Sequence, residues 1–89
     1  MKFAVAHYKK DSSDWFVNGG KLIVADGKYT LKSFMKTIAV FEADQTIVRK
    51  IPDEMWYKGI SMWDGQKEYN IYFFKNTANK VYTRFGIAW

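Results

Sequence analysis

Residues 26–52 contain three short alternating stretches separated by turn signals, and this pattern constrains the fold more than any other part of the chain. Asp26-Gly27 is a hairpin dipeptide, because glycine accepts a positive φ and aspartate tolerates one. We expect strands over residues 28–36, 38–42 and 46–51, with a turn at residues 43–45. Pro52 lacks the N–H that a ladder needs, so it is expected to end the third strand. The stretch therefore predicts a three-strand meander.

The rest of the chain supplies further short strands with tight turns between them. We expect these strands at residues 2–10, 21–25, 60–63, 67–75 and 80–89, with residues 15–17 as a short strand or a core plug. No segment shows helical periodicity over the length that a stable helix needs, and at most one short helix is expected near residues 52–58. Together these features predict an all-β fold, a small antiparallel meander of about seven or eight strands that forms a barrel or a curved sheet.

Length and composition limit the protein to a single β domain over residues 1–89. The chain contains 7 Phe, 6 Tyr and 4 Trp, which is more aromatic surface than a small core encloses, so several of these side chains are expected at the surface. It contains no cysteine, which excludes disulfides and thiolate metal sites and fits either a reducing compartment or a domain that is stable without disulfides. No apolar run is long enough to span a bilayer. We expect a cytoplasmic protein, bacterial or phage-like in its economy.

No catalytic or metal motif is present in the sequence. His7 is the only histidine and no nucleophile signature accompanies it, so a catalytic triad is not indicated. A zinc site needs several His or Cys ligands, which this chain does not have. Five of the nine acidic residues fall in predicted turns, where turn formation explains them. We therefore expect no enzyme, no metal and no cofactor.

Two groups of residues are candidates for binding. The first is a basic strip with one aromatic side chain, which consists of Lys28, Lys32, Lys36 and Phe34. Lys21, Arg49 and Lys50 would extend this strip. A strip of this kind suits the phosphates of lipid or nucleic acid. The alternative is a solvated strand whose lysines discourage edge pairing, and the net charge of +5 is equally consistent with solubility alone.

The second group combines aromatics and a cation on one face of two expected neighbouring strands: Tyr72, Phe74, Tyr82 and Arg84. If exposed, this face would suit the stacking of single-stranded nucleic acid or the docking of a protein, because Tyr and Arg are enriched in both. The alternative is a face covered by Trp15, Trp56 or a partner subunit.

Two hairpins of the sequence resemble those of bacterial pleckstrin-homology-like and GRAM-type domains. Gly20-Lys21-Leu22-Ile23-Val24 followed by Tyr29-Thr30-Leu31-Lys32-Ser33-Phe34 is similar to the opening hairpin, and Ile71-Tyr72-Phe73-Phe74 followed by Val81-Tyr82 is similar to the closing strands. The resemblance covers roughly residues 18–85. Those domains close one end of a barrel with a C-terminal amphipathic helix, whereas residues 80–89 here are expected to be a strand. The resemblance implies a non-catalytic adaptor that binds protein or membrane.

These observations favour a small non-catalytic interaction module that binds through an aromatic, basic face. An unknown protein is the expected partner, and homodimerisation is a further expectation, given the surplus of large apolar side chains. A nucleic-acid-binding β domain is the main alternative, and an anionic lipid surface is a third partner consistent with the charge.

Overall fold

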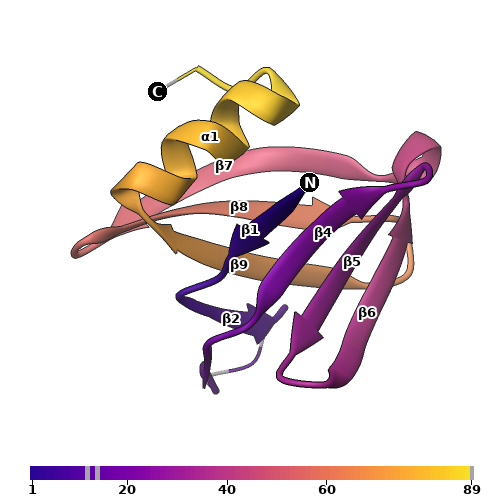
Figure 1. Ribbon diagram of the computed structural model, residues 1–89, viewed down its shortest axis with the longest axis horizontal. Coiled ribbons are helices and arrows are strands. Elements are labelled where there is room, and N and C mark those ends of the chain that lie inside the picture. The colour runs from indigo at the N-terminus through magenta and orange to yellow at the C-terminus, as the bar shows by residue number, and fades with distance from the viewer. Residues whose placement is uncertain (12, 14, 89) are drawn as a thin grey trace.

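The structure is a computed structural model that describes residues 1–11, 13 and 15–88. These residues form nine strands in two curved antiparallel sheets and one C-terminal α-helix (Figure 1). The prediction of an all-β domain built from a meander of short strands is confirmed. No ladder in this part of the chain joins the two sheets into a closed barrel.

Each sheet contains one run of three consecutive strands. Sheet A has the order β1–β4–β5–β6, made of β1 (Lys2–Ala4), β4 (Lys21–Ala25), β5 (Lys28–Ser33) and β6 (Lys36–Glu42). Sheet B has the order β3–β2–β9–β8–β7, made of β3 (Val17–Asn18), β2 (His7–Lys10), β9 (Glu68–Phe74), β8 (Tyr57–Trp63) and β7 (Ile47–Glu54). A short 3-10 helix, η1 (Ala43–Gln45), connects the two runs.

The core lies between the inner faces of the two sheets. Leu22 and Leu31 of sheet A are fully buried, as are Ile60 and Ile71, which lie opposite each other in sheet B. The expected single strand at residues 2–10 is divided between the sheets, because β1 pairs with β4 and β2 pairs with β9. The N-terminal segment therefore connects both sheets around one core.

Helix α1 (Lys75–Phe85) covers one end of the sheets, where the sequence predicted a turn and a strand. This prediction was wrong for all the described residues that it covers; Trp89 lies outside them. Gly86 ends the helix at φ +67°, and the N–H groups of Gly86 and Ile87 donate to the carbonyls of Thr83 and Tyr82 at 3.3 and 2.8 Å. These two bonds form a Schellman cap, which satisfies carbonyls that a helix end otherwise leaves unpaired.

The expected short helix near residues 52–58 is also wrong, because these residues form the β7–β8 hairpin. Strand β7 continues through Pro52 to Glu54, and a turn at Met55 and Trp56 leads into β8. Proline is tolerated here because β7 is an edge strand and its pairing is irregular between Ile51 and Glu54.

Candidate binding site

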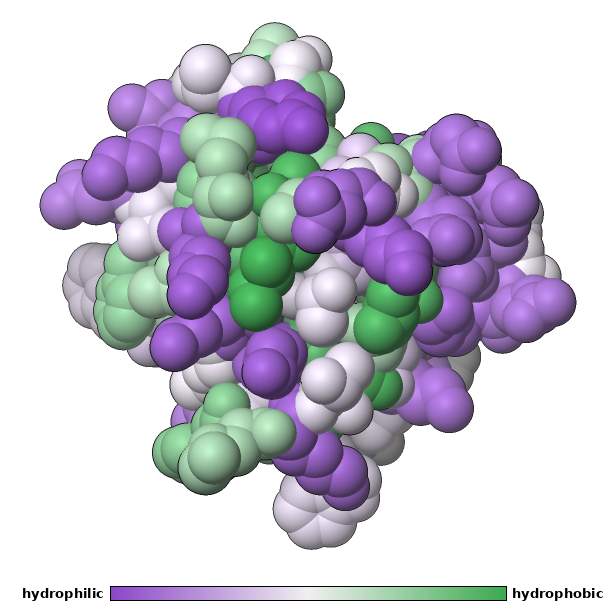
Figure 2. Space-filling model, turned by 45° about the vertical axis from the view of Figure 1, so that its right-hand side comes forward, coloured by the Kyte–Doolittle hydropathy of each residue, from purple (hydrophilic) through white to green (hydrophobic). Residues whose placement is uncertain are grey.

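A groove of about 660 Å³ lies between strand β1 and helix α1. Its lining is mostly apolar, and the residues that form its walls are Met1, Lys2 and Phe3 on the strand side and Asn79, Lys80, Thr83 and Arg84 on the helix. Figure 2 shows one face of the molecule, on which hydrophilic side chains surround smaller apolar areas. The groove is larger than a second hollow of about 170 Å³ beside Ile47 and Trp63, and it combines apolar surface with a charged rim.

Helix α1 forms one wall of the groove, because one side of the helix is buried and the opposite side is polar and faces the groove. Ala78, Val81 and Tyr82 are buried against the sheets. The Tyr82 hydroxyl donates a 2.9 Å hydrogen bond to the carbonyl of Gly59 in β8, which fixes the helix on sheet B. Lys80 and Arg84 are four residues apart, so they lie one turn from each other on the side that faces the groove.

Three cations at the groove have no carboxylate partner in the described part of the chain. The ion pairs found there are Lys58–Asp53 at 2.7 Å and Lys67–Asp64 at 2.6 Å, and His7 lies 3.9 Å from Glu54 in a contact that is ionic only when the imidazole is protonated. None of them includes Lys2, Lys80 or Arg84. The Arg84 guanidinium carbon lies 5.8 Å from the ring of the adjacent Phe85, a contact that leaves its N–H donors available to an anion.

The positive surface continues from the groove across the outer face of sheet A. Ala4 of β1 lies opposite Lys21 of β4, and Lys21 lies opposite Lys32 of β5. Lys28 lies four residues from Lys32 on the same face of β5, but its cross-strand neighbour Glu42 offsets its charge. Lys21 and Lys32 therefore extend the cationic rim, and Lys28 contributes less.

The predicted basic strip is only partly assembled. Lys28 and Lys32 share the outer face of β5, but this strand ends at Ser33 and Lys36 begins β6. Lys36 lies opposite the buried Ser33, so it belongs to the other face of the sheet. Phe34 sits in the hairpin turn, 88% exposed, and is not among the lysines of the strip.

Two further cations that were expected to extend the strip are located elsewhere. Arg49 and Lys50 belong to β7, at the edge of sheet B. The Lys50 ammonium lies 5.9 Å from the centre of the Tyr82 ring, so it packs on the helix rather than beside Lys21. Arg49 and Lys50 therefore do not extend the row of Lys21 and Lys32.

The predicted aromatic face is not formed, because the residues assigned to its second strand are helical. Tyr82 is fully buried in α1, whereas Arg84 lies in the groove. Phe74 is exposed where β9 passes into the helix. Tyr72 is buried on the outer face of sheet B. Of the four residues, only Arg84 contributes to the candidate site.

The outer face of sheet B is covered by an aromatic cluster around His7. The imidazole stacks on Tyr72 with ring centres 4.8 Å apart and makes edge contacts with Tyr57 and Phe16 at 4.7 and 4.9 Å. Burial lowers the pKa of His7 below its usual 6.5, although the charge of Glu54 opposes this shift. Trp15 and Trp56, which the alternative interpretation placed over this face, are exposed instead.

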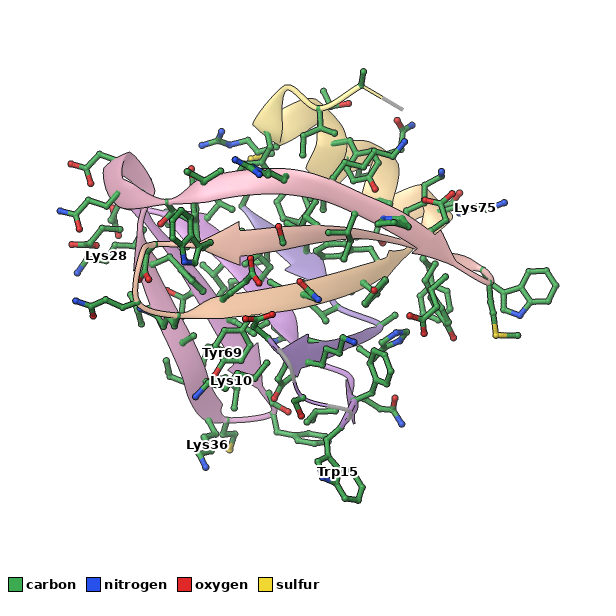
Figure 3. The ribbon with its side chains drawn as sticks, turned by 180° about the vertical axis from the view of Figure 1, so that it is seen from behind. Lys10, Trp15, Lys28, Lys36, Tyr69 and Lys75 are labelled. Atoms are coloured by element: carbon green, nitrogen blue, oxygen red, sulfur yellow. The ribbon has the colours of Figure 1, made fainter. Side chains whose placement is uncertain are left out.

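Three loop tips expose large apolar side chains, a feature that the sequence analysis did not locate. They carry Trp15, the pair Phe34-Met35 and the pair Met55-Trp56, whose exposed fractions lie between 70% and 95%. Phe34 and Met55 also adopt positive φ angles, 55° and 53°, which are uncommon for large side chains. None of these residues lines the groove, and Trp15 and Lys36 both lie at the end of the molecule away from α1 (Figure 3).

The sequence analysis missed Lys2, Asn79, Lys80 and Thr83 as site residues. The signal that could have found the last three is a helical period, since Ala78, Val81, Tyr82 and Phe85 follow the spacing of one buried helix face. The four residues that face the groove then fall together on the other side of the helix.

Comparison of the chain with protein-family models, with curated proteins and with solved structures found no match in any of the three. Within residues 1–11, 13 and 15–88, no three His, Asp or Glu side chains gather as a metal site would need. Of the helices described, none is both long enough and apolar enough to cross a bilayer.

Proposed function

We propose that this protein is a non-catalytic interaction module that binds a negatively charged protein partner at the groove between β1 and α1. The observation that carries the proposal is the arrangement of Lys2, Lys80 and Arg84 around a mostly apolar hollow, with no carboxylate partner among the described residues. The apolar floor would supply affinity, and the cations would steer an anionic partner and select it.

The resemblance to pleckstrin-homology-like and GRAM-type domains supports the same role. Those domains carry an amphipathic helix at the C-terminus, and α1 holds the corresponding place in this chain, with one side buried and the other facing the groove. In this proposal the protein is a cytoplasmic adaptor. A protein segment fits a concave site better than a flat membrane surface does.

Binding of single-stranded nucleic acid is less well supported. A stacking platform needs exposed aromatic rings beside the cations that hold the phosphates. Tyr72 and Tyr82 are buried, and Trp15 lies in a loop at the other end of the molecule from α1. The exposed apolar tips favour self-association instead, which we keep as a second candidate, and light scattering over a range of protein concentrations tests it.

The proposed function is tested by removing charge from the groove. The variant Lys80→Gln/Arg84→Gln loses two cations, and the matched control Lys10→Gln/Lys36→Gln loses two exposed cations at the end of the molecule away from α1. Binding of fluorescently labelled poly-L-glutamate is followed by anisotropy. We expect the groove variant to bind about tenfold more weakly at low ionic strength, and the control to change by no more than about twofold.

Circular dichroism and thermal unfolding verify that both variants are folded. Equal weakening in the two variants would show that only net charge matters and would contradict a specific site. An unchanged affinity in the groove variant would exclude the groove as the binding surface.

A further inference from the structure

Strand β1 directs backbone groups toward the groove that have no hydrogen-bond partner among the described residues. The Val5 N–H donates to the Gly20 carbonyl at 2.9 Å, which shows that Val5 directs its backbone groups toward the β4 side. Along an antiparallel strand these groups alternate between the two sides, so Phe3 also faces β4. The N–H and C=O groups of Lys2 and Ala4 therefore point to the other side, on which α1 lies (Figure 1).

This edge is open because strand β9 stops before reaching it. The Ala6 N–H donates to the Tyr72 carbonyl at 2.9 Å, so β9 flanks the chain directly after β1. Strand β9 ends at Phe74, and Lys75 begins α1. The place beside β1 that a longer β9 would fill therefore holds no strand among the described residues, and α1 forms its outer wall.

The other sheet edges are less suited to pairing. Strand β6 has a bulge, since Ile38 is left between the paired Thr37 and Ala39. Strand β7 contains Pro52 beside an irregular stretch of pairing, and β3 has only two residues. Bulges, prolines and very short strands are features that protect an edge from added strands. Strand β1 itself has only three residues, but its edge has neither a bulge nor a proline. Backbone bonds to sheet A also extend the paired stretch on both sides, since the Val24 N–H donates to the Met1 carbonyl at 2.8 Å and the Val5 N–H donates to the Gly20 carbonyl at 2.9 Å.

We propose that the groove receives an extended acidic peptide segment of the partner, which adds to sheet A as a strand along β1. The proposal rests on the function proposed above and specifies how the partner is held. Backbone hydrogen bonds to Lys2 and Ala4 would hold the main chain, as in other cases of strand addition. The segment takes the place beside β1 that β9 leaves empty.

Alternation of side chains along a strand determines which peptide sequence fits. One set of side chains on the added strand would lie on the outer face, next to the row that contains Lys21 and Lys32. The other set would lie on the inner face, beside Phe3, and α1 would border the free edge of the added strand with Lys80 and Arg84. The preferred segment therefore alternates acidic and small apolar residues.

The test compares two peptides of equal composition and charge. One alternates Glu and Val over seven residues, beginning and ending with Glu, and the other places its four Glu before its three Val. Binding to the full chain is followed by anisotropy. We expect the alternating peptide to bind at least about tenfold more tightly, because only that peptide places its acids and its apolar groups on separate faces of a strand.

Amide hydrogen exchange locates the added strand. In the free protein the N–H groups of Lys2 and Ala4 should exchange quickly and that of Phe3 slowly. At saturation with the alternating peptide we expect exchange at Lys2 and Ala4 to slow by about tenfold or more, with little change at Phe3. Saturated binding without this protection would overturn strand addition.

The outcomes separate this inference from the proposed function. Equal affinity for the two peptides, with binding still lost in Lys80→Gln/Arg84→Gln, would leave the acidic partner in place and exclude strand addition. Binding of either peptide that does not depend on Lys80 and Arg84 would overturn the proposed function as well. Failure of the alternating peptide to bind, together with binding of phosphatidylserine vesicles that depends on these cations, would replace the peptide with a lipid surface.

Discussion

Replacing Tyr82 by phenylalanine removes one buried hydroxyl and tests how α1 is held on the sheets. The side chain is fully buried, and its hydroxyl donates a 2.9 Å hydrogen bond to the Gly59 carbonyl. The variant keeps the ring and loses this bond, which should lower the free energy of unfolding by about 1.5 kcal/mol. For a domain of this size the corresponding fall in Tm is about 6–12 °C. Thermal and urea unfolding followed by circular dichroism measure both quantities.

Tyr8→Phe is the matched control, because Tyr8 is almost as deeply buried but its hydroxyl forms no hydrogen bond within the described residues. We expect this control to change stability by less than about 0.5 kcal/mol. Equal losses in the two variants would show that the Tyr82 hydroxyl makes no specific contribution, and the helix would then be held by apolar packing alone.

The effect of Tyr82→Phe should also depend on pH. Burial, together with the charge of Asp53, raises the pKa of Tyr82 above its usual 10.0. A pKa that is higher in the folded state contributes stability that is complete below the unfolded value and is lost as pH rises through the folded value. The variant has no such titration, so the gap between the two proteins should narrow above about pH 10. A gap that is constant from about pH 8 to pH 11 would refute the reasoning.

Three further predictions concern single positions. Burial lowers the pKa of His7 in the folded protein, so the neutral imidazole should contribute its full stability above pH 6.5, and this stability should be lost as pH falls through the folded pKa. Urea unfolding should therefore show a smaller loss of stability at acid pH in His7→Phe than in the wild type. Gly86→Ala should cost about 1 kcal/mol in thermal unfolding, since φ is +67° at the helix cap, and an unchanged Tm would contradict the cap's role. Phe34→Gly should stabilise the protein by up to about 1 kcal/mol, because an exposed residue at φ +55° is relieved of strain; a loss of stability would show that Phe34 makes a contact of its own.

The sheets could be predicted from the sequence because turn dipeptides separate their strands. Asp26-Gly27 and Asp64-Gly65 mark two turns, and the alternation on either side of them determines which residues face the core. The β5–β6 turn was missed because Phe34 and Met35 are not turn formers. This error placed Lys36 on the same strand as Lys28 and Lys32.

Helix α1 could not be predicted from local preference. Asn, Thr, Val, Tyr and Phe, which make up much of it, are weak helix formers, and no side chain caps its N-terminus at Phe74. Two periods fit the segment, since Val81, Thr83 and Phe85 alternate as in a strand while Ala78, Val81 and Tyr82 follow a helix. Tertiary packing decides between them, because burial of one helix face contributes more than propensity does.

The residues assigned to the candidate site depend on whether residues 80–84 form a strand or a helix. As a strand, residues 80–84 would place Tyr82 and Arg84 on one face, which suggested a single aromatic and basic surface. As a helix, the same residues bury Tyr82 and present Lys80 and Arg84 together, beside a strand edge about 80 residues earlier in the chain. Such a juxtaposition follows only from the tertiary fold.

The separation of charge from exposed aromatic surface is the structural feature that distinguishes the possible partners. The unpaired cations surround a concave, mostly apolar groove, whereas Trp15 and the other exposed tips lie on loops that do not line it. A ligand that needs stacked rings and phosphate contacts at one place does not find both here. A strand with acids on one face and apolar groups on the other would match the edge of β1, the apolar surface of the groove and its cationic rim. Cationic and aromatic side chains therefore lie on different surfaces of this protein. Salt should weaken binding at the groove and leave self-association through the apolar tips largely unaffected.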